Sequence, residues 1–375
     1  MRQKVLIVRI CALGDIVAAT GVIDSIHKSN PEMEIHFLTW ESGLPILEGL
    51  NCAPIAIPRG LRLATFLNGT TYDYVIDLHG GVRSAIGGWR YVLPHPRGGI
   101  AHNYFEILKE SGLSTIFPRA RLEVNPTDAG RIAARIGDSA EYICISPFCR
   151  IRDKEWPVEN YIQLIRRLTD SWKGELILVG SQADEARGEA FSEVVRSHHV
   201  LNWIGKTSLG EFKALLKGAT LSISGDTGSM HIASALNTDA LAIFGANIPE
   251  VGVPAAGNIY IIRGTPGESP YLKHPQDEMR SVSVDEVLEV TLRVLSGKAE
   301  KFSIDPPTES AMQTLFDLLA SGIKLKNIYG IRSGWKKVSN EIESSSRKTL
   351  EEFQKSLIPI THSPIAPSDQ ELFGF

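Results

Sequence analysis

The sequence predicts an α/β protein made of two doubly wound, Rossmann-like domains. The first observation behind this prediction is the length of 375 residues, which at about 150 residues per domain favours two domains. The second is the recurrence of short, wholly apolar, β-branched runs, which are typical of parallel strands buried on both faces. The third is the alternation of these runs with helical patterns, which is typical of βαβ units.

The first half of the chain contains the pattern of one such domain. Val5–Val8 is a wholly apolar run, and a loop from Ile10 to Gly14 follows it. A helix is expected over Asp15–Ile23, because its apolar residues fall on one side. Further strands are expected at Glu34–Thr39 and Tyr74–Leu78.

The second half repeats this alternation. The expected strands are Tyr142–Ile145, Glu175–Val179, Leu221–Ser224 and Ala240–Phe244. The expected helices are Ala129–Ile136, one opened by Pro157, and Val284–Leu295.

The domain junction is expected within residues 118–140, where the sequence is first irregular and polar and then helical. We therefore expect an N-terminal domain over 1–140 and a second domain over 141–300. Residues 301–375 form a C-terminal extension of uncertain structure, since their patterning is weak.

The composition is that of an ordinary globular protein. Hydrophobic residues make up 43% and charged residues 22% of the chain, so each half can bury a core. The formal net charge of -4 argues against a general nucleic-acid-binding protein, which usually carries a basic excess. The 4 cysteines are too few for a disulfide framework. No apolar run approaches the ~18 residues of a membrane-spanning helix, and no signal peptide is evident, so we expect a soluble cytoplasmic protein.

The stretch from Gly225 to His231 carries the strongest functional pattern, Gly-Asp-Thr-Gly-Ser-Met-His. A strand runs into a turn and a helix begins directly after it, which presents free N–H groups and the positive end of the helix dipole to an anion. Gly225 and Gly228 allow close approach to the backbone. The alternative is a simple helix cap, in which Asp226 or Thr227 satisfies the first N–H groups. The pattern favours a phosphate site.

A second pattern, Leu13-Gly14-Asp15, follows the first strand. Ligands of open α/β sheets bind beyond the carboxyl ends of the strands, so Asp15 is placed to accept a proton from a substrate hydroxyl. The alternative, which the residue taken alone favours, is that Asp15 is a helix N-cap. The loop lacks the Gly-x-Gly-x-x-Gly fingerprint, so the sequence does not predict a dinucleotide site.

Two further loops follow strands of the second half. The loop from Arg150 to Pro157 contains Lys154 among its cations, and it either holds a diphosphate or is a solvated charged loop. The loop after Gly180 places Asp184 at a helix start. An acid there either binds ribose hydroxyls or complements the helix dipole.

Three residues of the first half are weaker candidates. His79 and Arg83 follow a strand, and Arg59 lies in a nearby loop. A single His or Arg is more often a surface or capping residue. The sequence contains no cluster with metal-ligand spacing, so no metal or cofactor is expected.

Taken in order, these motifs resemble those of the family 9 glycosyltransferases, the ADP-heptose:lipopolysaccharide heptosyltransferases. The resemblance spans about residues 1–296 and is carried by Leu13-Gly14-Asp15, Tyr72–Gly80 with Arg83-Ser84, Lys154-Glu155-Trp156-Pro157 and Gly225–Ala233. It implies a GT-B fold, in which two Rossmann-like domains enclose an interdomain cleft. It also implies an inverting transferase without a bound metal, whose N-terminal domain binds the acceptor and whose C-terminal domain binds the nucleotide sugar.

The resemblance also assigns roles to individual residues. Asp15 would be the general base, and Lys154 would neutralise charge on the leaving group. The donor-binding residues would be Asp184, Asp226, Thr227, Gly228, Ser229 and His231. The acceptor side would include His79, Arg83 and Arg59.

Some segments depart from the family pattern. Ser146–Cys149 stands where members often have a glycine-rich start, Ala246–Pro249 replaces a Pro-Thr turn, and His274–Arg280 replaces a Cys-Met feature. These departures leave the transferred sugar and the acceptor open. Two alternatives therefore remain: another GT-B nucleotide-sugar enzyme of the epimerase type, and a non-catalytic nucleotide-sugar-binding module.

The expected partners are a nucleotide-diphospho sugar, ADP-heptose by the resemblance, and a glycolipid or glycan acceptor. Such an acceptor implies peripheral contact with the inner face of the cytoplasmic membrane. The basic stretch from Lys324 to Lys348 would add ~1 kcal/mol of attraction to anionic lipid per basic residue near the surface. Liposome binding by a variant lacking residues 301–375 tests this hypothesis.

Overall fold

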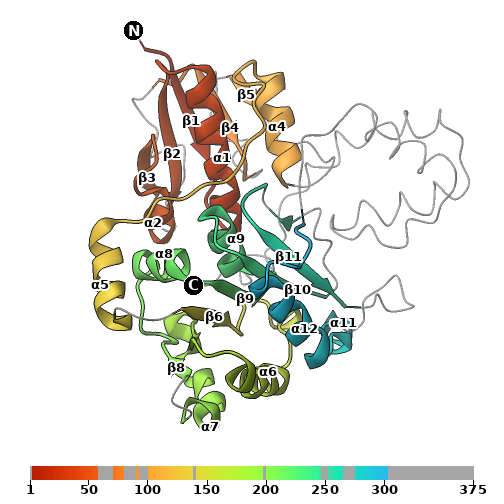
Figure 1. Ribbon diagram of the computed structural model, residues 1–375. Helices are drawn as coiled ribbons and strands as arrows, with labels where there is room; N and C mark the ends of the chain where they lie inside the picture. The colour runs from red at the N-terminus through yellow and green to blue at the C-terminus, as the bar shows by residue number, and fades with distance from the viewer. Residues whose placement is uncertain are drawn as a thin grey trace, which may run out of the picture. The chain divides into compact units, whose positions relative to one another are not determined.

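Two parallel β-sheets, one from each half of the chain, form the framework of the protein (Figure 1). The computed structural model describes residues 2–57, 71–79, 90–92, 100–137, 141–196, 200–245, 252–253, 255–264 and 275–302. The expectations for Arg59, Arg83 and the extension beyond Phe302 lie outside these residues.

The first sheet has 5 strands in the order β3-β2-β1-β4-β5. Its strands are β1 (Lys4–Val8), β2 (Glu34–Trp40), β3 (Ala53–Ile57), β4 (Tyr74–Asp77) and β5 (Arg90–Val92), and every neighbouring pair is parallel. Helices α1 (Leu13–Ser29) and α4 (Ile100–Glu110) pack against each other, and the 3-10 helix η1 (Glu41–Gly43) and the short helix α2 (Leu44–Leu47) follow β2. This strand order is that of a doubly wound sheet.

The second sheet has 6 strands in the order β11-β10-β9-β6-β7-β8. Its strands are β6 (Tyr142–Ser146), β7 (Glu175–Leu178), β8 (Val200–Asn202), β9 (Leu221–Gly225), β10 (Ala240–Phe244) and β11 (Ile259–Arg263). All neighbouring pairs are parallel. The helical segments that accompany these strands are η2 (Arg152–Lys154), α6 (Val158–Ser171), η3 (Gln182–Phe191), α7 (Ser192–Val195), α8 (Leu209–Gly218), α9 (Gly228–Ala235), α11 (Pro275–Ser281) and α12 (Val284–Leu295).

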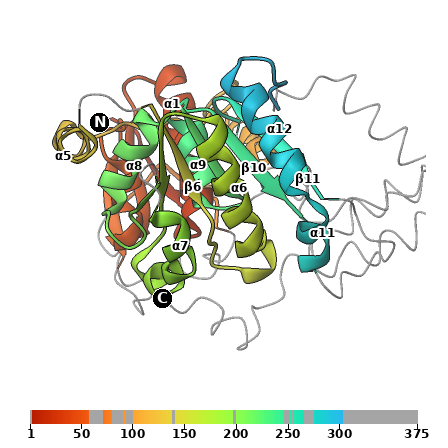
Figure 2. The same ribbon diagram turned by 60° about the horizontal axis from the view of Figure 1, so that its bottom comes forward.

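Alternate residues of the second sheet pack into different cores. Ile143 and Ile145 of β6 belong to a cluster that also contains buried residues of α6 and α12, and these two helices lie side by side (Figure 2). Cys144, between them, belongs to the cluster that contains residues of α8 and α9. The sheet is therefore covered on both faces, which explains why its central strands are wholly apolar.

The segment between the two sheets is hydrogen bonded to both halves. The N–H groups of Ala120 and Leu122 donate to the carbonyls of Ala255 and Ala235 over 2.8 and 3.0 Å. The N–H of Arg121 donates to the Thr20 hydroxyl of α1 over 3.1 Å.

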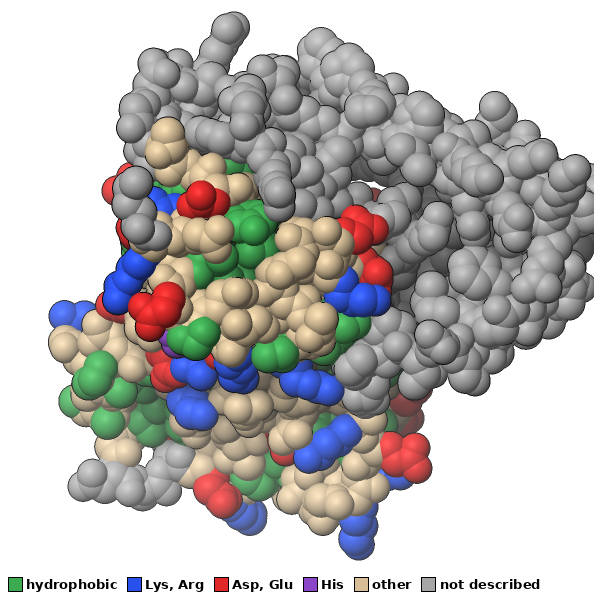
Figure 3. Space-filling view, turned by 90° about the horizontal axis from the view of Figure 1, so that it is seen from above, with side chains coloured by type: hydrophobic (Ala, Val, Ile, Leu, Met, Phe, Trp, Pro, Cys, Tyr) green, Lys and Arg blue, Asp and Glu red, His purple; other side chains and the backbone are tan. Residues whose placement is uncertain are grey.

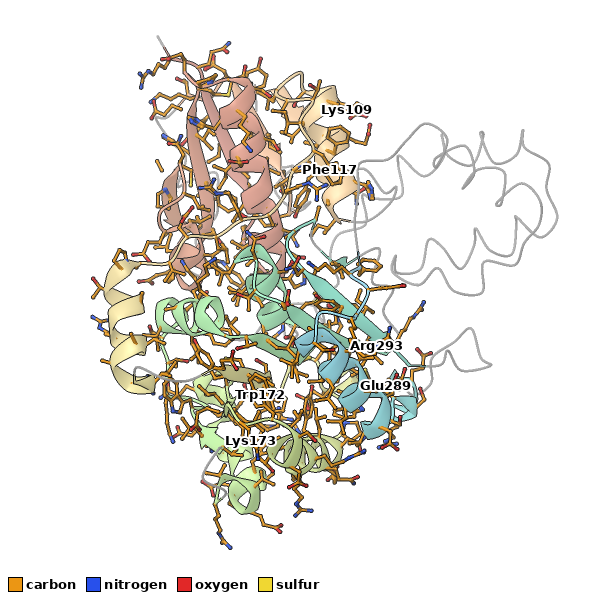
Figure 4. The ribbon with its side chains drawn as sticks, viewed as in Figure 1. Lys109, Phe117, Trp172, Lys173, Glu289 and Arg293 are labelled. Atoms are coloured by element: carbon orange, nitrogen blue, oxygen red, sulfur yellow. The ribbon has the colours of Figure 1, made fainter. Side chains whose placement is uncertain are left out.

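Phe117, labelled in Figure 4, anchors the same segment. It is in a hydrophobic cluster with Met230 and Phe244 of the second half. The sequence alone does not indicate that this connecting segment contributes to a core of the second half.

Helix α5 (Pro126–Ile136) falls in the expected N-terminal domain but packs against α8 of the second half. Lys213 of α8 is buried, and its ammonium donates to the Pro45 carbonyl of α2 over 2.6 Å. The domain boundaries near residues 140 and 300 stay predictions.

The structure confirms the predicted strands and helices in position and type. The helix predicted over Asp15–Ile23 is longer, because α1 begins at Leu13 and continues to Ser29. The sequence patterns do not predict the four edge strands β3, β5, β8 and β11, nor helices α4 and α8. Among the helices that the structure describes, none is both long and apolar enough to cross a membrane.

Charged side chains of both signs lie on the face seen in Figure 3. Blue Lys and Arg side chains are interspersed with red Asp and Glu side chains over its described part. This face therefore does not present a field of one sign, in keeping with a net charge of -4.

Candidate functional site

Polar residues gather where the strand order of each sheet reverses. In the first sheet this point lies between β1 and β4, whose carboxyl ends lead to Arg9, Asp15 and His79. In the second sheet it lies between β6 and β9, which lead to Lys154 and Asp226. Ligands of open α/β sheets bind at such switch points.

The N-terminus of α9 is not capped by a side chain. Thr227 is its N-cap residue and has extended backbone, but its side chain accepts no hydrogen bond from the helix. The Thr227 hydroxyl is buried and, within the described structure, has no hydrogen-bond partner. The first N–H groups of α9 are thus not satisfied by Thr227, which is the arrangement that favours an anion over a self-contained cap.

Lys154 and Asp226 form an ion pair beside this helix terminus. The Lys154 ammonium donates to Asp226 Oδ2 over 2.7 Å, and the two side chains are 30% and 11% exposed. Because Gly225 has no side chain, the backbone of Lys154 can approach it closely. A Cβ at Gly225 would lie 3.0 Å from the Lys154 carbonyl oxygen. Lys154 is therefore held at the strand end by a partner, contrary to the solvated-loop alternative.

A second ionic cluster continues from the residue after Lys154. Arg187 donates to the two carboxylate oxygens of Glu155 over 2.9 and 2.5 Å and to Asp184 over 3.3 Å. Its guanidinium carbon lies 4.0 Å from the centre of the Phe148 ring. The hydrogen bond that Arg187 donates to Glu155 raises the pKa of the guanidinium, so the cation is retained.

Asp184 is largely occupied by its own helix. It is near the start of η3, and its carboxylate accepts from the Ser181 N–H over 3.1 Å and from the Ser181 hydroxyl over 2.6 Å. Asp184 thus acts as an acidic residue in the first turn of η3, which is the second of the two roles that the sequence left open. A ribose contact by Asp184 stays a prediction.

Asp15 is in the first turn of α1 and is paired with Arg9. The Arg9 guanidinium donates to Asp15 Oδ2, and the N–H of Ala12 donates to the same oxygen over 3.2 Å. The capping alternative is therefore correct in part, although α1 begins at Leu13 and Asp15 is not the N-cap residue. The Asp15 side chain is 33% exposed and that of Arg9 is 15% exposed.

The N-termini of α1 and α9 lie against each other. A Cβ at Gly14 would come within 2.7 Å of the His231 ring, and a Cβ at Gly228 would lie 3.0 Å from the Leu13 side chain. The structure thus brings the Asp15 loop and the Gly225–His231 loop together (Figure 1), although their sequences are more than two hundred residues apart.

His231 is buried at this contact, with 6% of its surface exposed. Burial lowers its pKa, the charges of Asp226 and Asp15 oppose this effect, and Lys154 adds to it. The imidazole is therefore neutral at neutral pH. Its Nδ1 atom has no hydrogen-bond partner in the described structure.

His79 lies on the first-sheet side of the site. Its N–H donates to Asp77 Oδ1 over 2.8 Å, and its Nδ1 atom is buried and unpaired in the part of the chain that is described. Burial and the nearby Arg9 charge lower the pKa of His79, while Asp77 acts in the opposite direction. A role in acceptor binding stays a prediction.

Sequence analysis did not identify Arg9 or Arg187 as site residues. Arg9 directly follows the apolar strand β1. A charged residue at the carboxyl end of a buried strand indicates a candidate site residue, so the sequence does contain a signal for Arg9. Arg187 had no such signal, because its partners Glu155 and Asp184 come from two separate loops. Within the described residues, no group of His, Cys, Asp or Glu side chains is arranged to hold a metal ion.

Comparison with known proteins shows a similarity to one family. Residues 103–280 match the model of "Glycosyltransferase family 9 (heptosyltransferase)". The chain is 35% identical to lipooligosaccharide heptosyltransferase 2 of Haemophilus influenzae over 119 residues, which is 31% of this chain and 34% of that protein. It is 23% identical to lipopolysaccharide heptosyltransferase 3 of Escherichia coli over 274 residues, which is 62% of this chain and 81% of that protein.

A solved structure extends the similarity to the fold. The structure of Escherichia coli ADP-heptose lipopolysaccharide heptosyltransferase II matches with a TM-score of 0.65 at 19% identity, covering 79% of this chain and 99% of that one. The predicted GT-B fold, with two doubly wound parallel sheets, is confirmed. The family match and the relatives together show that the chain is similar to the heptosyltransferases of glycosyltransferase family 9.

Proposed function

We propose that the chain is an inverting transferase that moves a heptose from ADP-heptose to a lipopolysaccharide-core or similar glycan. The similarity to the family 9 model supports a glycosyltransferase, and the names of the relatives supply heptose and ADP-heptose as the sugar and the donor. The observation that carries the proposal is the contact between the first turn of α1, which bears Asp15, and the uncapped N-terminus of α9.

The proposed reaction divides the work between these two helix ends. Asp15 accepts the proton of an acceptor hydroxyl, and the hydroxyl oxygen attacks the anomeric carbon from the face opposite the diphosphate. The bond from the anomeric carbon to the diphosphate oxygen breaks, and ADP leaves with the electron pair. The sugar is thereby transferred with inversion.

The α9 terminus suits the leaving group. The diphosphate would accept from the N–H groups of Gly228 and Ser229 and from the unpaired Thr227 hydroxyl. Lys154 is near enough to Asp226 to share its charge between that carboxylate and the diphosphate. Positive charge at the departing oxygens stabilises the transition state more than the bound donor.

The proposed role of His231 is to fill the space between the two loops rather than to supply a charge. Its neutral ring is buried beneath the contact between α1 and α9. A neutral imidazole does not compete with Lys154 for the diphosphate, and it keeps the two loops at a fixed separation. His79, Arg83 and Arg59 remain the proposed acceptor side.

The test is transfer by the purified chain with ADP-heptose, with and without a heptose-accepting core glycan. We compare wild type, Asp15→Asn and the matched control Asp24→Asn, a residue of the same helix that is paired with Lys28 on the other side from the site. Wild type and Asp24→Asn should release ADP and form glycan product, and Asp15→Asn should bind the donor but retain only a small residual rate of turnover.

Three outcomes contradict the proposal. Conversion of the donor without any acceptor would favour the epimerase-type alternative. Donor binding without turnover across a panel of core glycans would favour a binding module. Turnover that survives in Asp15→Asn would leave Asp15 as a helix-capping residue only.

A further inference from the structure

Arg9 is fixed by its position between two strands. Its N–H donates to the Leu38 carbonyl of β2 over 3.1 Å. Its guanidinium donates through Nη1 to the Leu78 carbonyl, just beyond β4. Because β2 and β4 flank β1 on its two sides, the direction of the Arg9 side chain is set by the sheet.

The other terminal nitrogen of the guanidinium, Nη2, reaches the carboxylate of Asp15, while Nε is buried and has no hydrogen-bond partner in the described structure. Arg9 Nη2 donates to Asp15 Oδ2, and the Ala12 N–H donates to that same oxygen. In the described structure, the other oxygen, Oδ1, accepts no hydrogen bond. The carboxylate is therefore asymmetric, with one oxygen held by two donors and the other open.

The charged groups around this carboxylate favour a retained Arg9 cation. Burial opposes the charge on Arg9, yet the charge of the Asp15 carboxylate and its hydrogen bond raise the pKa of the guanidinium. The phenol of Tyr104 is buried without a hydrogen-bond partner in the described structure, and burial raises its pKa. Tyr104 therefore stays protonated and does not replace Asp15 as the base.

We propose that Arg9 is the positioning residue of the transfer reaction, holding Asp15 Oδ2 so that Oδ1 is the oxygen that accepts the acceptor proton. This inference rests on the proposed function, in which Asp15 is the base. A general base must stay within hydrogen-bond reach of its proton, and an error of about 1 Å can cost roughly 100-fold in rate. Arg9 supplies that restraint from the rigid sheet rather than from the loop.

The experiment is a double-mutant cycle between Arg9 and Asp15, with kcat, acceptor KM and donor Kd measured separately. Arg9→Met removes the guanidinium at similar length, and Arg9→Lys keeps the charge but loses the second donor group. Arg121→Met is the matched control, because Arg121 is paired with Asp24 of the same helix away from the site.

We expect Arg9→Met to lower kcat by roughly 10- to 100-fold with donor Kd within about twofold of wild type. Arg9→Lys should recover part of that loss, and Arg121→Met should leave kcat unchanged. In the Asp15→Asn background, Arg9→Met should change the residual rate by no more than about twofold, since residues acting as a unit are not additive.

Equal losses in both backgrounds would overturn the inference, because Arg9 would then act independently of Asp15. A loss confined to donor Kd or to thermal stability in both Arg9 variants would also overturn it. Failure of the proposed function is a separate result, since it is observed in wild type and Asp15→Asn before any Arg9 variant is measured.

Discussion

Gly14 at the start of α1 lies directly against the His231 ring of α9. A Cβ on Gly14 would come within 2.7 Å of the ring carbon Cδ2 and 2.9 Å of Nε2. His231 is buried, so its ring has little room to move away. The contact between α1 and α9 therefore leaves room for the hydrogen atom of Gly14 but not for a methyl group at that position.

Gly14→Ala should consequently destabilise the protein by about 1–3 kcal/mol, the usual cost of overpacking, and should lower transfer. Urea unfolding and kcat measure the two effects. Gly130→Ala is the control, because Gly130 is in helix α5 and a Cβ there meets no other atom within 4 Å. That substitution should be neutral or stabilising by up to about 1 kcal/mol. Equal effects at both glycines would contradict the proposed close contact.

Lys154→Met should lower kcat by about 100- to 1000-fold, the range for loss of one charged group that stabilises a transition state. The side chain keeps its length but no longer carries charge to the leaving diphosphate. Lys173→Met, an exposed lysine beyond α6 (Figure 4), serves as the control and should have wild-type kcat. An unchanged kcat in Lys154→Met would leave the ion pair with Asp226 as a structural feature.

Arg187→Lys should weaken ADP binding by about tenfold while kcat changes little, in line with the loss of a charge-assisted hydrogen bond. A lysine cannot reproduce the paired bonds to Glu155 or the stacking on Phe148. Arg293→Lys is a matched exchange at an exposed ion pair with Glu289, 3.9 Å long on α12 (Figure 4). Calorimetric titration with ADP should show the difference for Arg187 alone. A wild-type Kd in Arg187→Lys would mean that this cluster does not support the nucleotide site.

The free energy of unfolding should fall when the pH is lowered below about 6.5, the ordinary pKa of histidine. Burial lowers the pKa of His231 and of His79 in the folded protein. In this pH range the unfolded chain binds protons that the folded chain does not, so acid favours unfolding. The loss should level off below the folded pKa values.

Urea unfolding at about pH 7.5, 6.5 and 5.5 measures this dependence. His231→Gln should reduce the slope between the two lower pH values, with His79 contributing the remainder. A pH-independent free energy of unfolding in wild type would contradict the buried, neutral state of both histidines.

Local patterns predicted most of the elements that matter for the site. The apolar run Val5–Val8 predicted β1, and the run Ala240–Phe244 predicted β10 with the same bounds. The Gly225–His231 stretch predicted a strand, turn and helix start in the right place. These features depend on neighbouring residues, through burial on both strand faces and through the geometry of a helix terminus.

Capping could not be decided from residue type. Asp15 and Thr227 are both good capping residues, yet Asp15 accepts from the Ala12 N–H while the Thr227 hydroxyl has no described partner. The difference depends on side-chain torsions and on the surrounding packing, which the sequence pattern does not contain.

The sequence by itself determined the strands, the helix starts and the candidate residues at their ends, because each depends on interactions within a few residues of the chain. Only the tertiary structure decided which of those residues meet. Arg9 pairs with Asp15, Lys154 pairs with Asp226 across 72 positions, and Gly14 rests on His231 of the other half. These contacts follow from the order of strands in two sheets and from the packing of α1 on α9. That order is set by the burial of whole faces, a property of the folded chain rather than of any one segment.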